Sequence, residues 1–448
     1  MVSPGSKRRG SRSIRMQSRR DASAVGTPRP GGRRSVGAGA GWRRWNRIGV
    51  ALALLTTAAH AQPSNSELAL LPAAETARAV LVGRVGDVVQ LDRTGYSARV
   101  SVERVLTGDA QPGGAAVRIG WEELGSARAP RLVDGQRVLV VLDDLPAGSL
   151  WRERFPAGTT ALVVSAHGDA WLTDPIAADL DLLAAYLRLG PRPSSAARAS
   201  ALTRMVAEAT PVLAAAGLAR LGSMPDAAAA VDSDACDRLM RTAADPSKPM
   251  TLRRDIVALA GRRRLAAAAP RLEVLARNGP PLAAPALAAL AEIGGGLPPA
   301  EIEDLLDRKD VELRAVGARF ATGAIAERRL PPMVRQDPAP VVRAAAAEAL
   351  AATRTAWGVD GAVPALADSD PTVRSSAAMA LGTLGDPVVP ALEAVARTQP
   401  AAARGAITAL ALAGPTGVAA VRRLVDDHPD PQLRAFARLA LGQGPHPH

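Results

Sequence analysis

Aromatic residues are scarce in this chain, at 2% of 448 residues, although 48% of the sequence is apolar. Without bulky rings, alanine, leucine and valine must fill any core. Small side chains let helices pack closely, because the distance between helix axes depends on the side chains at the contact. The composition therefore predicts an alanine-rich helical array, and the length suggests two or three domains.

Cysteine and histidine are also rare. Cys236 is the single cysteine, which excludes an intrachain disulfide and a cysteine-based zinc cluster, and we expect an inert thiol. The best metal-like cluster is Asp426–Asp430, which contains His428, but a turn between repeats with capping acids explains it more simply. The remaining histidines are His60, His167, His446 and His448, of which the last two lie in a tail, 443–448, that we expect to be frayed.

Catalytic motifs are absent from the sequence. It contains no G-x-x-x-x-G-K-[ST] phosphate loop, no G-x-S-x-G, no H-E-x-x-H, and no His-Glu dipeptide of the kind that a diiron hydroxylase built on helical repeats would repeat. Glu122 and Glu123 could pair as acid and base, but a surface loop is the simpler interpretation. The sequence therefore predicts no enzyme activity, no catalytic residue, no cofactor and no metal.

The positive charge is confined to one end of the chain. The formal net charge is +12, yet the first 48 residues hold thirteen of the 55 Lys/Arg and only one of the 43 acids, Asp21. Acids and bases are therefore equal in number after residue 48. A neutral body does not attract phosphates by bulk electrostatics, so the sequence argues against nucleic acid as a partner.

The order of residues 43–62 predicts a secretory signal peptide at the end of a basic, disordered head, 1–61. Three arginines precede an apolar core of about twelve residues, Ile48–Ala59, which is followed by Ala59-His60-Ala61 and Gln62. The core is well short of the ~20 residues that span a bilayer. We expect cleavage between Ala61 and Gln62, a periplasmic or secreted bacterial protein, and no membrane span in the mature form. An uncleaved anchor and a chance apolar run are the alternatives.

Residues 78–189 carry strand signals after a linker, 62–77. Runs rich in valine are broken by Gly, Pro and Asp, and in 96–103 apolar and polar residues alternate as in a half-solvated strand. Val138–Leu142 is apolar on both faces, which predicts a central strand. The segment closes on a helix near 177–189. The pattern predicts a small antiparallel barrel or sandwich.

Three pieces of this segment resemble a known fold: Val82–Val85, Val102–Gly108 and Gly135–Leu142. Their order is similar to that of bacterial domains with a netrin-like or tissue-inhibitor-like oligosaccharide-binding barrel. The resemblance implies a fold and no site, since the cysteines that some of these barrels carry are missing.

A helical repeat occupies residues 200–442, after a linker at 190–199. In the stretch Asp368–Asp386, Val373, Ala377, Leu381 and Leu384 share one helix face. Pro371 suits the first helical turn, and Asp370 can cap its free N–H groups. A second helix is expected over 387–397, so that one unit is a helical hairpin.

Arginine recurs near the start of the first helix of each unit at a period of about 30 residues. Such a period with two helices predicts a solenoid, in which stacking buries the apolar face that each unit cannot bury alone. A weaker unit, 210–222, precedes the others and is followed by an insertion, 223–248. Ala284 takes the arginine's place in one unit, and the arginines are Arg253, Arg314, Arg343, Arg374, Arg404 and Arg434.

Acids accompany several of these arginines, as in Asp310/Arg314, Asp370/Arg374, Asp430/Arg434 and, more loosely, Asp337/Arg343. We expect them to act as helix caps and as a ladder of hydrogen bonds between repeats. Contacts with a ligand are the alternative role.

The pattern D-P-x-V-R-x-x-A-A-x-A-L-G-x-L-G-D at 370–386 closely resembles HEAT repeats, in particular the thirty-residue type first noticed in phycobilin lyases. The resemblance implies an α-solenoid with a concave partner-binding surface, and it does not imply lyase activity.

We therefore expect an exported, monomeric, non-enzymatic scaffold that holds a protein partner in its groove. The alternatives are an enzyme or enzyme subunit, with bilin-type lyase or protease-inhibitor activity, and a cytoplasmic or membrane-tethered adaptor.

Overall fold

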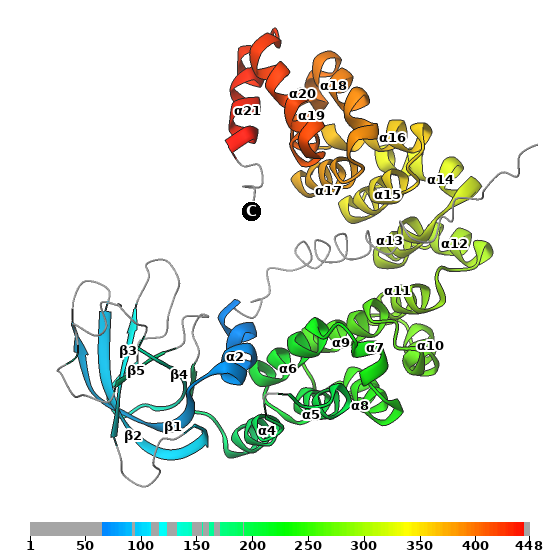
Figure 1. The fold of residues 1–448 in the computed structure, drawn as a ribbon. Helices are drawn as coiled ribbons and strands as arrows, with labels where there is room; N and C mark the ends of the chain where they lie inside the picture. Colours follow the sequence, from blue (N-terminus) through cyan, green and yellow to red (C-terminus); the bar gives the residue numbers. More distant parts are fainter. Residues whose placement is uncertain are drawn as a thin grey trace, which may run out of the picture.

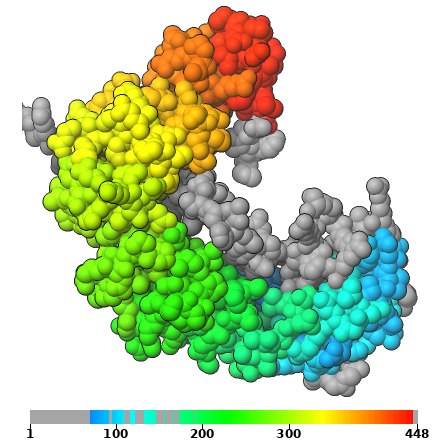
Figure 2. Space-filling model, turned by 180° about the vertical axis from the view of Figure 1, so that it is seen from behind, coloured from blue at the N-terminus to red at the C-terminus, as the bar shows by residue number. Residues whose placement is uncertain are grey.

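The computed structural model describes residues 65–91, 95–108, 116–122, 132–145, 155, 161–164, 171–190 and 192–442. Within these residues a small sheet stands at one end of a long array of helices, and the whole forms a crescent (Figures 1 and 2). The expected head, signal peptide and cleavage site, together with the tail, Glu123 and His167, lie outside the described residues. No helix in the described ranges is both long enough and apolar enough to cross a membrane.

The sheet contains six strands in the described residues: β1 (Ala79–Gln90), β2 (Gly95–Thr107), β3 (Ala116–Glu122), β4 (Arg137–Asp144), β5 (Ala161–Val164) and β6 (Trp171–Thr173). β1 pairs antiparallel with both β2 and β4, and β2 pairs antiparallel with β3. β5 lies between β3 and β4, antiparallel to β4 but parallel to β3. The predicted small antiparallel sheet is present, with the β3–β5 pair as a parallel exception.

Alternating residues decide which face of each strand is buried. On β2, Ala98, Val100 and Val102 are buried and Arg99 is exposed, as the alternation predicted. Ser97 departs from it, because this residue is completely buried on the face expected to be solvated. The run Val138–Leu142 is buried on both faces, and its strand, β4, pairs with β1, β5 and β6. The predicted central strand is thus confirmed.

A helix replaces the linker expected at 62–77. α2 (Asn65–Thr76) buries Leu70 and Leu71, and it packs against α6 (Pro211–Ser223). The second expected linker, 190–199, is also partly helical, because α5 (Ser195–Glu208) begins inside it. The polar residues at both places suggested linkers. Both segments are helical because their apolar residues, at positions 70, 71, 199 and 202, are buried in one shared hydrophobic core.

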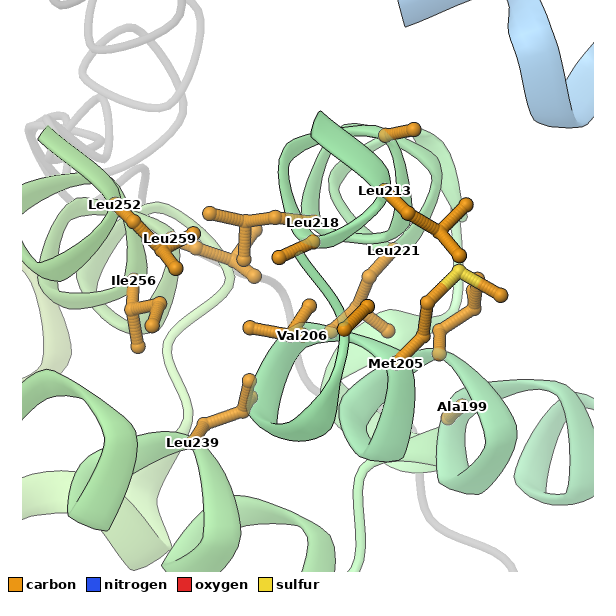
Figure 3. Packing of buried hydrophobic residues seen from close by; sticks show 14 of the residues in the cluster. Ala199, Met205, Val206, Leu213, Leu218, Leu221, Leu239, Leu252, Ile256 and Leu259 are labelled. Carbon is orange, nitrogen blue, oxygen red and sulfur yellow. The ribbon is translucent and has the colours of Figure 1, made fainter. Parts of the chain in front are cut away.

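The sheet and the array share one hydrophobic core. A single cluster joins Val80 of β1 and Leu139 of β4 to α2, to α4 (Ala177–Leu187) and to the first helices of the array. Figure 3 shows Leu213 of α6 beside the sulfur of Met205 of α5, with Leu221 of α6 between the two helices.

A polar contact ties the same elements together. The guanidinium of Arg220 on α6 binds both carboxylate oxygens of Glu75 on α2 at 2.6 and 2.7 Å, and the hydroxyl of Tyr186 on α4 donates to the same carboxylate. Burial, together with this hydrogen bond, raises the pKa of Tyr186 well above its usual value. The base of the array is therefore fixed to the N-terminal helix by both apolar and charged contacts.

The array consists of two rows of helices. Row one contains α6, α9 (Met250–Arg262), α11 (Ala283–Gly294), α13 (Val311–Phe320), α15 (Pro340–Ala352), α17 (Pro371–Gly382), α19 (Pro400–Leu412) and α21 (Pro431–Gly442). Row two contains α5, α8 (Ser233–Ala244), α10 (Ala269–Arg277), α12 (Pro299–Leu306), α14 (Gly323–Gln336), α16 (Ala356–Ala362) with η2 (Val363–Ala367), α18 (Val389–Thr398) and α20 (Gly414–Asp427). Neighbouring row-one helices are in contact throughout.

Two details of the expected repeat need correction. The hairpins with the closest contact join a row-two helix to the row-one helix that follows it, as in α14–α15 and α18–α19, so the unit begins one helix earlier than expected. The supposed insertion at 223–248 contains the short α7 (Ala227–Ala230) and then α8, which packs between α5 and α10. It therefore continues row two.

The repeat pattern explains the packing of each row-one helix. On α17, Val373, Ala377 and Leu381 are completely buried, and Leu384 just beyond the helix is partly buried. Pro371 occupies the first helical turn, where its missing N–H costs nothing. The carboxylate of Asp370 accepts hydrogen bonds from the amides of Thr372 and Val373, which confirms the predicted cap.

Candidate binding face on the row-one helices

Row one lines the concave side of the crescent. From α6 through α17, each row-one helix lies nearer to the hollow than its row-two neighbour (Figure 1). The space-filling view shows the hollow between the two ends of the molecule (Figure 2). Side chains on successive row-one helices therefore form one extended surface.

A ladder of arginines follows the N-terminal ends of these helices. Nη1 of each ladder arginine donates to two backbone carbonyls in the turn before its own helix, five and six residues earlier. This geometry recurs at Arg314, Arg343, Arg374 and Arg434. The contact fixes the turn that leads from row two into row one.

The other edge of the guanidinium, Nε and Nη2, reaches the next unit. Arg343 binds Asp368 at 2.7 and 2.8 Å, and Arg314 binds Asp337 at 3.1 and 3.2 Å. Each of these aspartates also accepts a backbone N–H two residues later, at 2.8 Å for Asp368 and 2.9 Å for Asp337. The ladder acid thus belongs to the following repeat.

Both roles predicted for these acids and arginines, helix caps and hydrogen bonds between repeats, occur in the described residues. Asp310, Asp370 and Asp430 cap their helices, since each accepts a backbone N–H from the first helical turn. The carboxylates that bind arginines of the preceding repeat are those of Asp337 and Asp368. In the looser pair, Arg343 donates to the backbone carbonyl of Asp337. The carboxylate of a capping acid accepts hydrogen bonds from its own helix. The arginine four residues later extends toward the neighbouring unit.

The pair Arg343–Asp368 is largely withdrawn from water, with side-chain exposures of 12% and 8%. The hydrogen bond from Arg343 lowers the pKa of Asp368, although burial acts in the opposite direction. The same hydrogen bond raises the pKa of Arg343. Both groups therefore remain charged, and each depends on the other for compensation.

Two of the predicted ladder arginines lie outside this geometry. α19 starts at Pro400, so the position equivalent to Arg343 is Ala403, and Arg404 is displaced by one residue, or about 100° around the helix. Arg404 is exposed and lies over the ring of Phe436, 5.7 Å from the centroid. Arg253 donates from Nε to the carbonyl of Ala243 at 2.8 Å. Ala284 is buried in α11.

The sequence reasoning missed a line of charged residues in the middle of row one. Glu292 on α11 interacts electrostatically with Arg319 on α13, and Arg319 interacts in turn with Glu348 on α15. The hydroxyl of Ser376 on α17 hydrogen-bonds Glu348. Burial raises the pKa of both glutamates above the usual value. It outweighs the lowering of the pKa by nearby arginines, chiefly Arg262 at Glu292 and Arg319 at Glu348. The sequence did contain one signal for this line: Glu292 and Glu348 are each the single acid of an alanine-rich helix.

Glu348→Gln tests the cost of this burial. Because the pKa of Glu348 is raised in the folded protein, the wild type loses stability as pH rises from the unfolded value of about 4.3 through the raised value. We expect the variant to gain stability relative to the wild type over that window and to be the more stable protein at pH 8. Urea unfolding at pH 4 and pH 8 measures this, with the exposed Glu327→Gln as the control, for which we expect no such change. Equal stability of Glu348→Gln and wild type at both pH values would contradict the prediction.

His428 is a buried turn residue, and both of its ring nitrogens contact the backbone. Nδ1 accepts the amide of Asp430 at 3.0 Å, and Nε2 lies 3.2 Å from the carbonyl of Ala396, which assigns the proton to Nε2. The described residues contain no group of three His, Cys, Asp or Glu side chains placed to hold a metal ion. The geometry at His428 is that of a turn between repeats.

His428→Ala should destabilise the fold by about 2 kcal/mol, because it leaves a buried carbonyl and an amide without their partner. Chemical unfolding monitored by circular dichroism measures the loss. Addition of zinc or a chelator to the wild type should leave its midpoint unchanged, and a metal-dependent shift would contradict this account of His428.

The remaining sequence candidates are dispersed. Cys236 on α8 is buried, and burial raises the pKa of its thiol to about 11, so it is protonated at neutral pH. Glu122 ends β3 in the sheet, far from the charged line on α11, α13 and α15. The structure therefore brings together the ladder and the charged line, and leaves the thiol and Glu122 apart from them.

Comparisons with known proteins give a family match for part of the array and similarity to solved structures. Residues 329–413 match the family model of HEAT repeats. Human deoxyhypusine hydroxylase in complex with glycerol is 18% identical, with a TM-score of 0.27 over 55% of this chain and 96% of that chain. The Escherichia coli protein YibA is 17% identical, with a TM-score of 0.32 over 54% of this chain and 91% of that chain. Among curated proteins, none matches the chain.

HEAT repeats generally mediate protein interaction, and here they lie within a longer two-row array. The chain thus contains HEAT repeats, which the family model places at residues 329–413.

Proposed function

We propose that this protein is an exported, non-enzymatic scaffold that holds a protein partner against row one, and that it acts as a monomer. The observation that carries the proposal is the placement of row one along the concave side of a HEAT-repeat crescent. Adjacent row-one helices are in contact, so a partner laid along the hollow can touch several units at once. The non-enzymatic part of the proposal rests on the lack of catalytic motifs in the sequence.

We further propose that the repeats are of the thirty-residue type and that the sheet is a small barrel of the oligosaccharide-binding kind. The pairings support the barrel, because the series β1–β2–β3–β5–β4 returns to β1. In this proposal the barrel supplies a second binding surface or an attachment point. It is held against the array by the shared core and by α2, whose Glu75 binds Arg220 of α6.

Fractionation of the natural source tests the export and the binding together. The protein purified from the envelope or medium should begin at Gln62, and it should co-purify with one protein in constant ratio. A mature protein that retains Trp42 would rule out export. Turnover of a substrate by the purified chain would overturn the scaffold proposal.

A further inference from the structure

The acid side of the ladder stops before the C-terminal end of the array. The ladder acids stand three residues before the proline that starts a row-one helix, as Asp337 does before α15 and Asp368 before α17. At the same place before α19 the chain has Arg397, and before α21 it has His428. Arg397 pairs with Asp427 at 2.9 Å, and His428 binds the backbone. From Arg374 onward the following repeat therefore supplies no carboxylate.

The arginines at this end keep one guanidinium edge free of carboxylates in the described part of the chain. Arg374 and Arg434 use Nη1 for the two carbonyls of their turns, as Arg343 does, and no ion pair involves their Nε–Nη2 edge. Arg404 is exposed with its face against Phe436, which holds the guanidinium in place. Arg438, one turn after Arg434, is also exposed.

The charge balance along row one points the same way. Each row-one helix from α9 to α15 contains an acid, whereas the charged residues of α17, α19 and α21 are all arginines. Asp370 and Asp430, which precede two of these helices, are occupied as caps. The middle of row one is therefore charge-compensated by its own residues, and the C-terminal end has an excess of positive charge.

We propose that α17, α19 and α21 form a docking site for an extended acidic segment of a protein partner, whose carboxylates occupy the free edges of Arg374, Arg404 and Arg434. The internal pair Arg343–Asp368 shows the expected geometry, with two parallel contacts of 2.7 and 2.8 Å. Bidentate pairing with a carboxylate is among the strong contacts that a guanidinium makes. This inference rests on the proposed scaffold function and specifies the chemistry of its partner.

The spacing favours acids at every third residue. Row-one helices in contact lie about 8–10 Å apart. A polyproline II segment rises about 3.1 Å per residue with three residues per turn, so side chains at i and i+3 share a face about 9 Å apart. A segment of that form presents one carboxylate to each of three successive helices.

Fluorescence anisotropy with the full mature chain tests the inference. The probe is a labelled peptide of three Asp-Pro-Pro triplets, and the controls are the same peptide with Asn for Asp and a peptide in which the three Asp are consecutive. We expect the first peptide to bind at least tenfold more tightly than either control, and to weaken with salt. Arg404→Gln should lower its affinity about tenfold, whereas Arg422→Gln, an exposed change on α20, should not alter it.

Equal binding of the three peptides, or an unchanged affinity in Arg404→Gln, would overturn the inference. So would tighter binding of a single-stranded oligothymidine than of the Asp-Pro-Pro peptide, because that result would favour phosphate as the ligand. If a native partner co-purifies with the chain while no acidic peptide binds, the scaffold proposal stands and only this inference fails.

Discussion

Arg343→Ala is expected to destabilise the protein by about 3–5 kcal/mol, the usual cost of removing one partner from a buried ion pair. The variant leaves the carboxylate of Asp368, whose side chain is 8% exposed, without its guanidinium. It also removes two hydrogen bonds to backbone carbonyls. Guanidinium-induced unfolding monitored by circular dichroism measures the effect.

Arg374→Ala is the matched control for this prediction. It removes the same kind of contact with two backbone carbonyls, but it leaves no carboxylate of the following repeat without a partner. We therefore expect a smaller loss of about 1 kcal/mol. Equal losses in the two variants would show that the link between repeats adds nothing to the turn contacts.

The pH dependence of Arg343→Ala follows from the lowered pKa of Asp368. A carboxyl whose pKa is lower in the folded state stabilises the fold above its unfolded value of about 3.9, and this stabilisation is lost as pH falls through the folded value. The variant should lose this part of its acid sensitivity. Unfolding at pH 7 and pH 3 should therefore show a smaller difference between wild type and variant at pH 3.

Gly382→Leu is expected to cost about 3 kcal/mol, the upper end of the usual range for overpacking, because α17 and α19 meet at this glycine. Even a Cβ atom there would lie 2.7 Å from the carbonyl oxygen of Ala409 and 2.7 Å from Cβ of Leu412. A larger side chain must push the two helices apart, and overpacking of this kind usually costs about 1–3 kcal/mol. Chemical unfolding of the purified variant measures the loss.

Gly294→Leu provides the comparison, since no atom of another helix lies within 4 Å of the Cβ position at this last residue of α11. Leucine is a better helix former than glycine by roughly 0.5–1 kcal/mol, so we expect this variant to be slightly more stable. A similar loss in both variants would contradict the claim that the row-one helices are held at the spacing that Gly382 permits.

The sequence predicted the local rules of the array well. The face formed by Val373, Ala377 and Leu381, the proline in the first turn and the aspartate cap are all present, because each depends on residues within one helix. The period predicts the stacking, but a repeating pattern does not determine which helix begins the unit. The hairpin α18–α19 forms because Gln399 is the only residue between those helices.

The candidate face was less predictable, because it depends on contacts between repeats. Arg343 and Asp368 are 25 residues apart, and nothing in the spacing favours that pair over the nearer acids. Arg404 stands four residues after the proline of its helix, where the ladder arginines of α15, α17 and α21 stand three, and the repeat period alone did not separate the two cases. Glu292 and Glu348 resemble ordinary surface acids until the neighbouring helices bury them.

Site-specific photo-crosslinking in the natural source tests most directly where the partner is held. A photoreactive residue is placed at Ser375 on α17 or Thr408 on α19, both exposed on row one, and at Ala394 on α18, exposed on row two. The account predicts one covalent adduct of the same size from both row-one positions and none from Ala394. Adducts formed at Ala394 but not at Ser375 or Thr408 would contradict it.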